Sequence, residues 1–176
     1  MKALRQVGAA RIGRYLWSLA LLGLLRLMCL PPMRAAFLRL CGARIGRNTI
    51  VQRFTAINVD RGGFKALQIG ADCFIGDEVL FDLAAPIVLE DQVTLAARAT
   101  ILTHLNVGYH DHPLQAQFPS QTAGVVIRRG SFVGANVTVL GGLTIGPQAF
   151  IAAGSVVNRD VANGALVGGV PARALR

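Results

Sequence analysis

The stretch IRRGSFVGANVTVLGGLTIGPQAFIAAGSVVN, from Ile127 to Asn158, repeats itself every six residues. The first position of each hexapeptide is always Ile or Val, and the fifth is small or aliphatic. Neither the 3.6-residue period of an α-helix nor the alternation of a simple β-strand explains a strict period of six. A chain that turns after each flat side of six residues, and closes a coil after three sides, does explain it. The stretch therefore predicts a solenoid.

Hexapeptides of the same kind occur earlier in the chain, so the solenoid is expected to occupy most of it. They begin at Ile45, resume at Ile69 after a break at Val59 to Gln68, and shift by two residues near Ala85-Pro86. The break is rich in glycine and charge, and we expect a loop at a corner there. Between Leu105 and Gly124 the pattern disappears, and a long loop inside a compact repeat array is often functional.

The repeat also predicts the shape of the coil. Apolar first residues would stack in ladders inside a triangular prism, and the small fifth residue fits beside each corner. Gly, Asn and Asp at the second to fourth positions allow turns that larger side chains resist. We therefore predict an all-β fold, a parallel β-helix of residues 41–176 with the loop 105–124 inserted. Its interior leaves little room for chemistry, so a site is expected on corners, on loops or between neighbouring prisms.

Residues 1–40 form an apolar and basic lead-in of different composition. An apolar run of eleven residues, Tyr15 to Leu25, stands between Arg14 and Arg26 and is too short for a spanning helix, which needs about 20. Pro31-Pro32 ends any helix that continues the run. A signal peptide is disfavoured, because Arg26 interrupts the apolar core and no A-x-A-like site follows. We expect a helix that either lies on a membrane or caps the open end of the solenoid, and a second short helix from Met33 to Leu40.

The formal net charge of +9 and the pI near 11 raise the question of nucleic acid binding. No aromatic-rich binding face accompanies the arginines that crowd the apolar region, which are Arg5, Arg11, Arg14, Arg26, Arg34 and Arg39. Such residues suit an anionic membrane or a phosphate-bearing partner, and we expect no nucleic acid partner. Cys29, Cys41 and Cys73 lack metal-site spacing and are expected to be buried free thiols in a reducing compartment.

Four segments together resemble the hexapeptide-repeat acyltransferases: Ile69 to Phe74, Ile145 to Phe150, Ala153 to Val161 and Val167 to Arg173. The last two carry Gly-Ser-Val-Val-x-x-Asp and Gly-x-Pro-Ala-Arg, and the resemblance covers about Gly42 to Arg176. It implies a left-handed β-helix, a homotrimer, and transfer of an acetyl or larger acyl group from coenzyme A to a hydroxyl or amine. The lead-in ending Leu-Arg-Leu-Cys-Gly-Ala-Arg-Ile-Gly is similar to acetyltransferases of exopolysaccharide and lipopolysaccharide synthesis, including the colanic-acid type.

Acyl transfer to a hydroxyl needs a base that takes the proton while the oxygen attacks the thioester, and imidazole titrates near the working pH. All three histidines lie within nine residues, and His104 resembles the catalytic histidine that the family places after a Thr-containing strand. In the sugar acetyltransferases of the family, that histidine stands two places later, which here is Asn106. Asp82, about one coil before His104, is a candidate to orient it, and Asp77 and Asp111 are rivals.

The loop residues Asn106, His110 and His112 are expected to line or shape the acceptor site. For the donor, matching to the family position by position points to small and cationic residues of the later coils, which are Ala135, Ala153, Asn158, Arg159, Arg173 and Arg176. The last two arginines are expected to meet the phosphates or adenine of the coenzyme. No nucleotide-phosphate loop occurs, so we expect acetyl-CoA as the only cofactor and no metal.

The resulting hypothesis is a cytoplasmic O-acetyltransferase of surface-polysaccharide biosynthesis that acetylates a saccharide or a lipid-linked saccharide. It would work at the inner face of the membrane if residues 1–40 bind lipid. Two alternatives stay open. A zinc carbonic anhydrase is built on the same kind of coil and binds zinc through histidines, although from separated coils. A scaffold that kept the solenoid and lost the chemistry is the other. Loop composition does not encode the acceptor, the acylated position or the acyl chain length.

Overall fold

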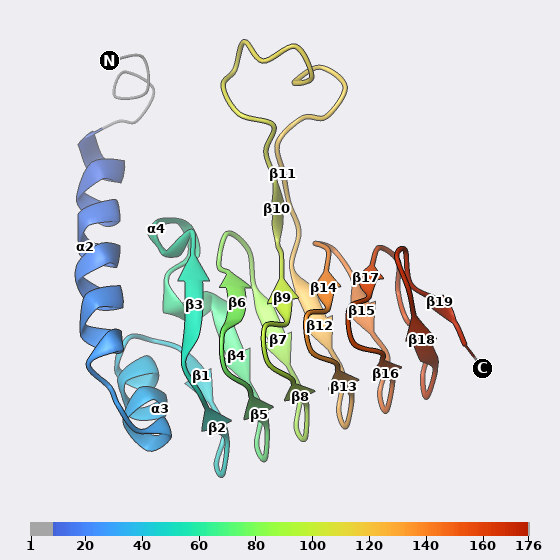
Figure 1. Ribbon diagram of the computed structural model, residues 1–176. Coiled ribbons are helices and arrows are strands. Elements are labelled where there is room, and N and C mark those ends of the chain that lie inside the picture. The colour runs from blue at the N-terminus through green and yellow to red at the C-terminus, as the bar shows by residue number, and fades with distance from the viewer. Residues whose placement is uncertain (1–8, 176) are drawn as a thin grey trace.

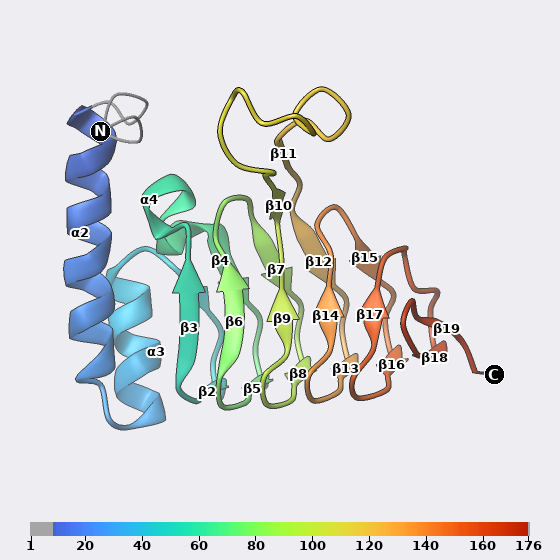
Figure 2. The same ribbon diagram turned by 45° about the horizontal axis from the view of Figure 1, so that its top comes forward.

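The computed structural model describes residues 9–175, in which three β-sheets wrap around one axis to form a triangular prism (Figure 1). Each coil rises on the near face, crosses at the upper corner and descends behind while it advances to the right, which makes the solenoid left-handed. Figure 2 shows the same stacking from a second direction. The expected left-handed parallel β-helix is confirmed.

Each sheet places every strand next to the strand of the following coil. Sheet A contains β1 (Arg44–Ile45), β4 (Leu67–Ile69), β7 (Ile87–Leu89), β12 (Val125–Ile127) and β15 (Thr144–Ile145). Sheet B contains β2 (Ile50–Val51), β5 (Phe74–Ile75), β8 (Thr94–Leu95), β13 (Phe132–Val133), β16 (Phe150–Ile151), β18 (Leu166–Gly168) and the antiparallel β19 (Arg173–Ala174). Sheet C contains β3 (Phe54–Ile57), β6 (Val79–Asp82), β9 (Thr100–Ile101), β14 (Thr138–Val139) and β17 (Val156–Val157). A separate antiparallel pair joins β10 (His104–Leu105) to β11 (Gln121–Thr122).

The first residues of the hexapeptides fill the interior as ladders. Those of sheet A pair in the order Ile45, Ile69, Leu89, Ile127, Ile145, and all are buried. Those of sheet B pair in the order Val51, Ile75, Leu95, Val133, Ile151, Val167, and all are buried. Apolar burial stabilises a fold by about 25 cal/mol per Å², so the ladders contribute along the whole axis. The pairing of Leu89 with Ile127 carries the ladder across the inserted loop.

The fourth position of each hexapeptide turns the chain through a left-handed conformation. Positive φ angles fall at Asn48, Asp72, Glu78, Gln92, Arg98, Gly130, Asn136, Gly142, Gln148 and Gly154. Gly, Asn and Asp were the residues expected there, so Glu78, Gln92, Arg98 and Gln148 correct that expectation. A left-handed residue with a side chain costs about 1 to 2 kcal/mol. The backbone N–H groups of Glu78, Gln92 and Arg98 offset the cost by donating to the preceding coil at 2.7, 2.8 and 2.9 Å.

Two helices, α2 (Ala9–Arg26) and α3 (Pro31–Leu40), cover the N-terminal end of the prism (Figure 1). Helix α3 buries Ala35 and Leu38 against the first coil. Pro31-Pro32 does separate the helices, yet it also forms the first turn of α3, which therefore begins two residues before the expected Met33. Proline fits there because the first N–H groups of a helix have no helical partner. Neither α2 nor any other helix within residues 9–175 is long and apolar enough to cross a membrane.

The segment Val59 to Gln68 is folded, which corrects the expectation of a loop. It forms α4 (Val59–Gly62) and the 3-10 helix η1 (Phe64–Ala66), and Val59 and Phe64 are buried. Gly62 is required by close packing, since an added Cβ would lie 2.3 Å from the carbonyl oxygen of Leu83. The inserted loop, by contrast, projects from the prism on the β10–β11 stem as expected (Figures 1 and 2).

The cysteines are all free, but only one of them is buried. Cys73 lies in the interior, Cys41 is half-buried and Cys29 is exposed. Burial raises the pKa of the Cys73 thiol, which keeps it protonated and unreactive. The expectation of buried thiols is therefore right for Cys73 and wrong for Cys29.

The ladders make a testable prediction about stability. Leu95 is fully buried between Ile75 and Val133. Leu95→Ala is expected to lower the free energy of unfolding by about 2 to 5 kcal/mol, because it removes apolar contacts and leaves a cavity. Urea denaturation followed by circular dichroism measures the change. The matched variant Leu114→Ala, on the exposed loop, is expected to stay within about 0.5 kcal/mol; equal losses in the two variants would contradict the ladder as the main source of stability.

Candidate active site

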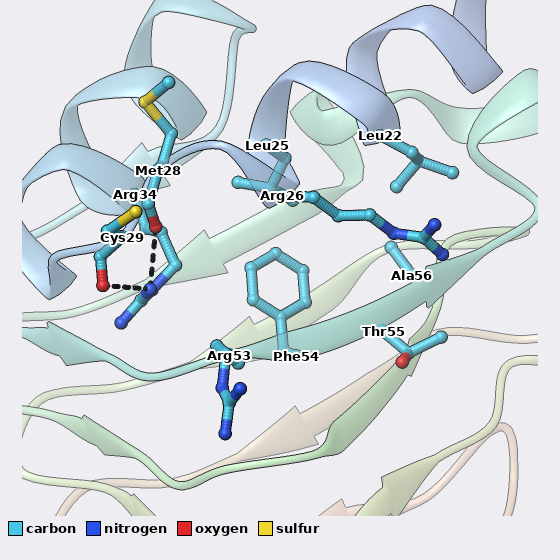
Figure 3. A pocket seen from close by; sticks show the side chains of 10 residues that line it. All are labelled: Leu22, Leu25, Arg26, Met28, Cys29, Arg34, Arg53, Phe54, Thr55 and Ala56. Carbon is cyan, nitrogen blue, oxygen red and sulfur yellow. Dashed lines mark hydrogen bonds between the residues drawn. The ribbon is translucent and has the colours of Figure 1, made fainter.

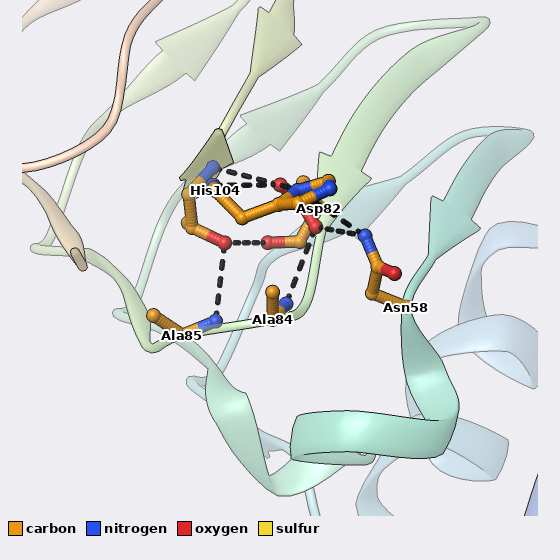
Figure 4. A network of polar contacts seen from close by, with 6 residues as sticks. Asn58, Asp82, Ala84, Ala85 and His104 are labelled. Atoms are coloured by element: carbon orange, nitrogen blue, oxygen red, sulfur yellow. Dashed lines mark hydrogen bonds and ion pairs between the residues drawn. The ribbon is translucent and has the colours of Figure 1, made fainter. Parts of the chain in front are cut away.

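Three successive strands of sheet C end at one corner of the prism, where sheet C passes into sheet A. Strand β3 is followed by Asn58, β6 ends with Asp82, and β9 is followed by Thr103 and His104. Figure 4 shows the side chains of Asn58, Asp82 and His104 gathered at this corner. His104 also pairs with Thr122 in the stem of the projecting loop. Residues far apart in the sequence therefore meet because the coils stack in register.

Asp82 is fully buried, and both of its carboxylate oxygens have partners. Oδ2 accepts hydrogen bonds from the backbone N–H groups of Thr103 and His104 at 2.9 and 3.0 Å, and lies 2.5 Å from Nδ1 of His104. Oδ1 accepts from Nδ2 of Asn58 at 2.7 Å and from the N–H of Ala84 at 3.3 Å. A buried charge is costly unless it is paired and hydrogen-bonded, and these contacts meet that requirement.

The network fixes the charge of Asp82 and the orientation of His104. Burial on its own raises the pKa of Asp82, but the hydrogen bonds from His104, Thr103 and Asn58 outweigh it and hold the pKa below its usual value. An ionised Asp82 accepts the Nδ1 proton of His104, so Nε2 is the unprotonated nitrogen of the neutral ring. Nε2 has no hydrogen-bond partner within residues 9–175, and the side chain is 22% exposed. His104 can therefore take a proton from a group outside.

Asn58 and Thr103 belong to this network and were not expected from the sequence. Asn58 has a left-handed backbone, and its Nδ2 lies 3.3 Å from Nδ1 of His104 as well as bonding Asp82. The buried Thr103 donates its Oγ1 hydrogen to the carbonyl of Asp82 at 2.7 Å and accepts from the N–H of Ala85 at 3.1 Å. The sequence could have indicated Asn58 by its position at the end of a sheet C side of the coil. The irregular segments after Asn58 and Asp82 differ in length, however, so counting residues in steps of one coil does not align Asn58 with His104.

Asp82, and not its rivals, contacts His104. Asp77 lies in the turn from β5 to β6, at a different corner, and forms an exposed ion pair with Arg53 at 3.7 Å. Asp111 lies in the projecting loop. A carboxylate one coil before His104 was predicted to orient the imidazole, and Asp82 makes that contact. The role of the pair in a reaction stays a prediction.

Two of the loop residues expected at the acceptor site form hydrogen bonds within the loop and not with His104. Oδ1 of Asn106 accepts from the N–H of Gly108 at 3.0 Å, and Nδ1 of His112 accepts from the N–H of Leu114 at 3.2 Å. His110 is exposed. Within the described part of the chain, no three or more His, Cys, Asp and Glu residues form a group that could hold a metal ion. The three histidines therefore do not converge as the zinc alternative requires.

The residues expected to bind the donor divide between two corners. Ala135 and Ala153 occupy the turns between sheets B and C on adjacent coils, where the N–H of Gly154 donates to the carbonyl of Ala135 at 2.8 Å. Asn158 and Arg159 are exposed after β17, at the corner that also holds His104 two coils earlier. The structure brings together each pair but does not bring the two pairs into one groove.

Of the two C-terminal arginines expected at the coenzyme, one can be placed. Arg173 lies exposed on β19, and its Nη1 donates to the carbonyl of Ala172 at 2.8 Å. Its guanidinium keeps further N–H groups that could meet a phosphate. Arg176 lies outside the described residues.

Known proteins share both the repeat and the fold. The family described as bacterial transferase hexapeptide (six repeats) matches residues 124–159, and the hexapeptide repeat of succinyl-transferase matches residues 67–101. WcaF of Escherichia coli, named provisionally as an acetyltransferase of colanic acid biosynthesis, is 30% identical over 146 residues, which cover 81% of this chain and 74% of WcaF. A serine acetyltransferase of Buchnera aphidicola is 33% identical over 108 residues, and the matched part is 61% of this chain and only 38% of that relative's length.

Among solved structures, the hexapeptide-repeat-containing acetyltransferase VCA0836 of Vibrio cholerae superposes with a TM-score of 0.82 at 28% identity, covering 97% of this chain and 93% of that one. Its complex with acetyl coenzyme A has a TM-score of 0.75 at 31% identity and covers 89% and 85% of the two chains. The solenoid and these matches define the class, which is that of left-handed β-helix transferases. The chain belongs to the bacterial hexapeptide-repeat transferase family, in which WcaF is one of its relatives.

The buried carboxylate predicts a pH-dependent loss of stability. Asp82→Asn is expected to lower the free energy of unfolding at neutral pH by about 1 to 3 kcal/mol for each of the two backbone N–H groups that lose Oδ2 as acceptor, because a neutral amide cannot replace it. The pKa of Asp82 is lower in the folded than in the unfolded chain, so its contribution is full above the unfolded value of about 3.9 and is lost as the pH falls through the folded pKa. Urea denaturation at several pH values should therefore show a gap between wild type and variant that shrinks as the pH falls below about 4. A gap that persists unchanged well below about pH 4 would refute the ionised assignment.

Proposed function

We propose that the protein is an acetyl-CoA-dependent O-acetyltransferase that modifies a saccharide hydroxyl in surface-polysaccharide biosynthesis, with His104 as the general base. The observation that carries the proposal is the contact of Nδ1 of His104 with the buried carboxylate of Asp82, which leaves Nε2 free to take a proton. Similarity to WcaF supports the polysaccharide role. The acetyl coenzyme A complex of the Vibrio cholerae relative supports the donor.

In this reaction Nε2 of His104 accepts the proton of the acceptor hydroxyl as its oxygen attacks the thioester carbonyl. The new carbon–oxygen bond forms, the carbon–sulfur bond breaks, and the imidazolium returns the proton to the coenzyme A thiolate. Asp82 stabilises the imidazolium and holds the ring in one tautomer. General-base catalysis of this kind contributes about 10² to 10⁴-fold to a rate.

The donor groove is proposed to lie between adjacent prisms of a homotrimer. Ala135 and Ala153 sit at one corner and Asn158 and Arg159 at another, so one groove can use both pairs only if two copies each present a different corner. The outer face of sheet B carries an apolar column, in which Phe132 stacks on Phe150 with ring centroids 4.7 Å apart. Exposed apolar surface of this kind favours association of subunits.

The acceptor is proposed to enter beneath the projecting loop, where Asn106, His110 and His112 lie on the loop side of His104. The loop stem begins at His104 itself, so a molecule bound along the loop reaches Nε2. We further propose that the reaction takes place in the cytoplasm at the inner face of the membrane, with residues 1–40 providing the lipid contact.

The test is an assay in which the purified protein transfers acetyl groups from acetyl-CoA to saccharide acceptors. The rate is measured from the release of the coenzyme A thiol. His104→Ala is expected to lower the rate by about 10² to 10⁴-fold, because the proton of the hydroxyl then has no acceptor. His110→Ala and His112→Ala are matched controls of the base assignment, and a much smaller loss is expected for each. A normal rate for His104→Ala, with the oligomer intact by light scattering, would remove His104 from the mechanism.

Binding of the donor separates an enzyme from a scaffold that lost its chemistry. Saturating acetyl-CoA is expected to raise the melting temperature of the wild type, because a ligand that binds only the folded state stabilises it. No stabilisation, together with no transfer, would favour the scaffold. Stoichiometric zinc in the purified protein would instead favour the carbonic anhydrase alternative.

Asn58 is predicted to act as a positioning residue for Asp82. Asn58→Ala is expected to lower kcat roughly tenfold, because the carboxylate that holds His104 loses one of its donors. The KM for acetyl-CoA should stay unchanged, and the pH profile of kcat should move. Asn48→Ala is the matched control, since Asn48 has the same left-handed backbone and donates to Asp72 at 3.0 Å on another corner. Equal kinetic losses in the two variants would show a structural role only.

A further inference from the structure

Helix α2 exposes an apolar side that nothing within the described structure covers. Ser18, Leu21, Leu22 and Leu25 face the prism, and the opposite side carries only apolar residues, which are Leu16, Trp17, Leu19, Ala20, Gly23, Leu24 and Leu27. Trp17 is 67% exposed and Leu27 65%. A helix on the surface of a soluble protein normally turns charged residues to the side away from the core. Among the described side chains of α2, the exposed charged residues are Arg14 and Arg26, and neither belongs to this apolar side.

The position of α2 leaves this side open even in an assembly. Figures 1 and 2 agree that α2 lies at the very end of the solenoid, across its axis and beyond α3 and the first coil. Subunits that pack through the sides of their prisms, with parallel axes, do not cover the end faces. Three copies of α2 would instead lie on one common face of the assembly.

The described residues of this end, 9–59, carry eight arginines and no Asp or Glu. Ten of the eighteen Lys and Arg residues, and none of the nine Asp and Glu residues, precede Asp60 in the sequence. The rest of the chain, from Asp60 onward, is close to neutral. An end face that is both apolar and cationic complements a bilayer surface that contains anionic lipids.

A cavity of about 500 Å³ beside α2 adds a place for a lipid phosphate. Leu22, Leu25 and Phe54 form apolar walls, and charge comes from Arg26 of the helix and from Arg53, the residue before strand β3 (Figure 3). No carboxylate lines the cavity. The Arg26 side chain extends over the cavity in Figure 3 and has no acidic partner within residues 9–175.

Further facts about the cavity bear on its use. Arg34 in its wall is engaged, because it donates to the carbonyls of Val51, Met28 and Cys29. Arg53 forms an exposed ion pair with Asp77 at 3.7 Å, so Arg26 is the arginine of the wall without a protein partner among residues 9–175. Strand β3, which forms the floor, leads directly to Asn58 of the His104 network. A molecule held in the cavity therefore lies on the same sheet as the candidate catalytic corner.

We propose that the N-terminal end of the prism docks on an anionic lipid bilayer, with the outer side of α2 at the boundary between headgroups and acyl chains and a lipid phosphate in the Arg26–Arg53 cavity. This proposal rests on the membrane location given in the proposed function. Docking on the bilayer does not itself require acyl transfer. With coils about 4.8 Å apart and a helical layer about 10 Å thick, His104 on the third coil stands about 20 Å above the membrane surface. A saccharide carried on a lipid phosphate reaches that height, so the proposal names the lipid-linked saccharide as the acceptor class.

Trp17 is the single tryptophan of the chain, so its fluorescence reports docking directly. The full-length protein is mixed with vesicles of phosphatidylcholine, with or without phosphatidylglycerol. We expect a blue shift of the Trp17 emission and co-sedimentation with the anionic vesicles, weaker binding to neutral vesicles, and no shift with inorganic phosphate. An unshifted emission with protein left in the supernatant would overturn the proposal.

Paired variants separate the apolar side from the cavity. Leu24→Gln with Leu27→Gln is expected to weaken vesicle binding at least tenfold, whereas Val170→Gln, equally exposed at the far end, should have no effect. Arg26→Gln with Arg53→Gln is expected to weaken binding to anionic vesicles by roughly thirty-fold, the effect of two cations at a charged surface. Arg129→Gln, an exposed arginine on a later coil, is its control. Equal losses of vesicle binding in the variants and their controls would show that the protein is attracted to the vesicles nonspecifically, and would contradict the assignment of the α2 end as the docking face.

Parallel measurements keep this inference separate from the proposed function. Transfer of acetyl to a soluble saccharide is assayed for each variant without vesicles and should be retained, which also shows that the variants fold. Vesicle binding without transfer would refute the proposed function and leave docking intact, and transfer without vesicle binding would do the reverse. A Trp17 emission already blue without lipid, with a sedimenting mass above the trimer, would assign the face to a second copy of the chain and overturn the proposal.

Discussion

Stacking of the coils in register is the constraint on which the rest of the structure depends. Each interior residue must lie over its counterpart one coil earlier, so extra residues can leave the prism only at a corner. The three insertions that lengthen a coil are the segment after β3, the residues Leu83 to Pro86 after β6, and the loop after β9. All three leave from the corner where sheet C passes into sheet A, on successive coils. The later coils pass the same corner without an insertion of that kind.

The candidate site exists because those departures share a corner. At a regular corner the turn residues face solvent, and a carboxylate there would be hydrated. Here α4 packs beside Leu83 and the loop stem begins at His104, so Asp82 is buried where backbone N–H groups are free to bond it. Burial on its own raises the pKa of Asp82, but the hydrogen bonds formed at this corner outweigh it, lower the pKa and fix the imidazole of His104. The irregular segments at this corner thus provide a buried, hydrogen-bonded carboxylate, which a regular corner of the prism lacks.

The ladders were predictable from the sequence because the first residue of every hexapeptide, such as Ile127 or Ile145, lies in the same apolar environment. Asp82 was predictable as a partner of His104 because one coil separates them. Asn58 was not, because 46 residues and two irregular corners intervene. The folded segment after Asn58 was mistaken for a loop, since its buried residues, Val59 and Phe64, are few among glycines and charges. The donor residues stay a prediction that rests only on likeness to the family. Their division between two corners follows from the pairing of the coils, which no single hexapeptide reveals.

The uninterrupted pairing of Leu89 with Ile127 also bears on how such proteins diversify. The projecting hairpin is inserted between two residues that contact each other as if nothing separated them. The part of the hairpin beyond the β10–β11 stem can therefore change in length and composition without altering the pairing of the coils. Under the proposed function, in which this hairpin contacts the acceptor, a hairpin transplanted from a relative would change the acceptor preference and leave the coils intact.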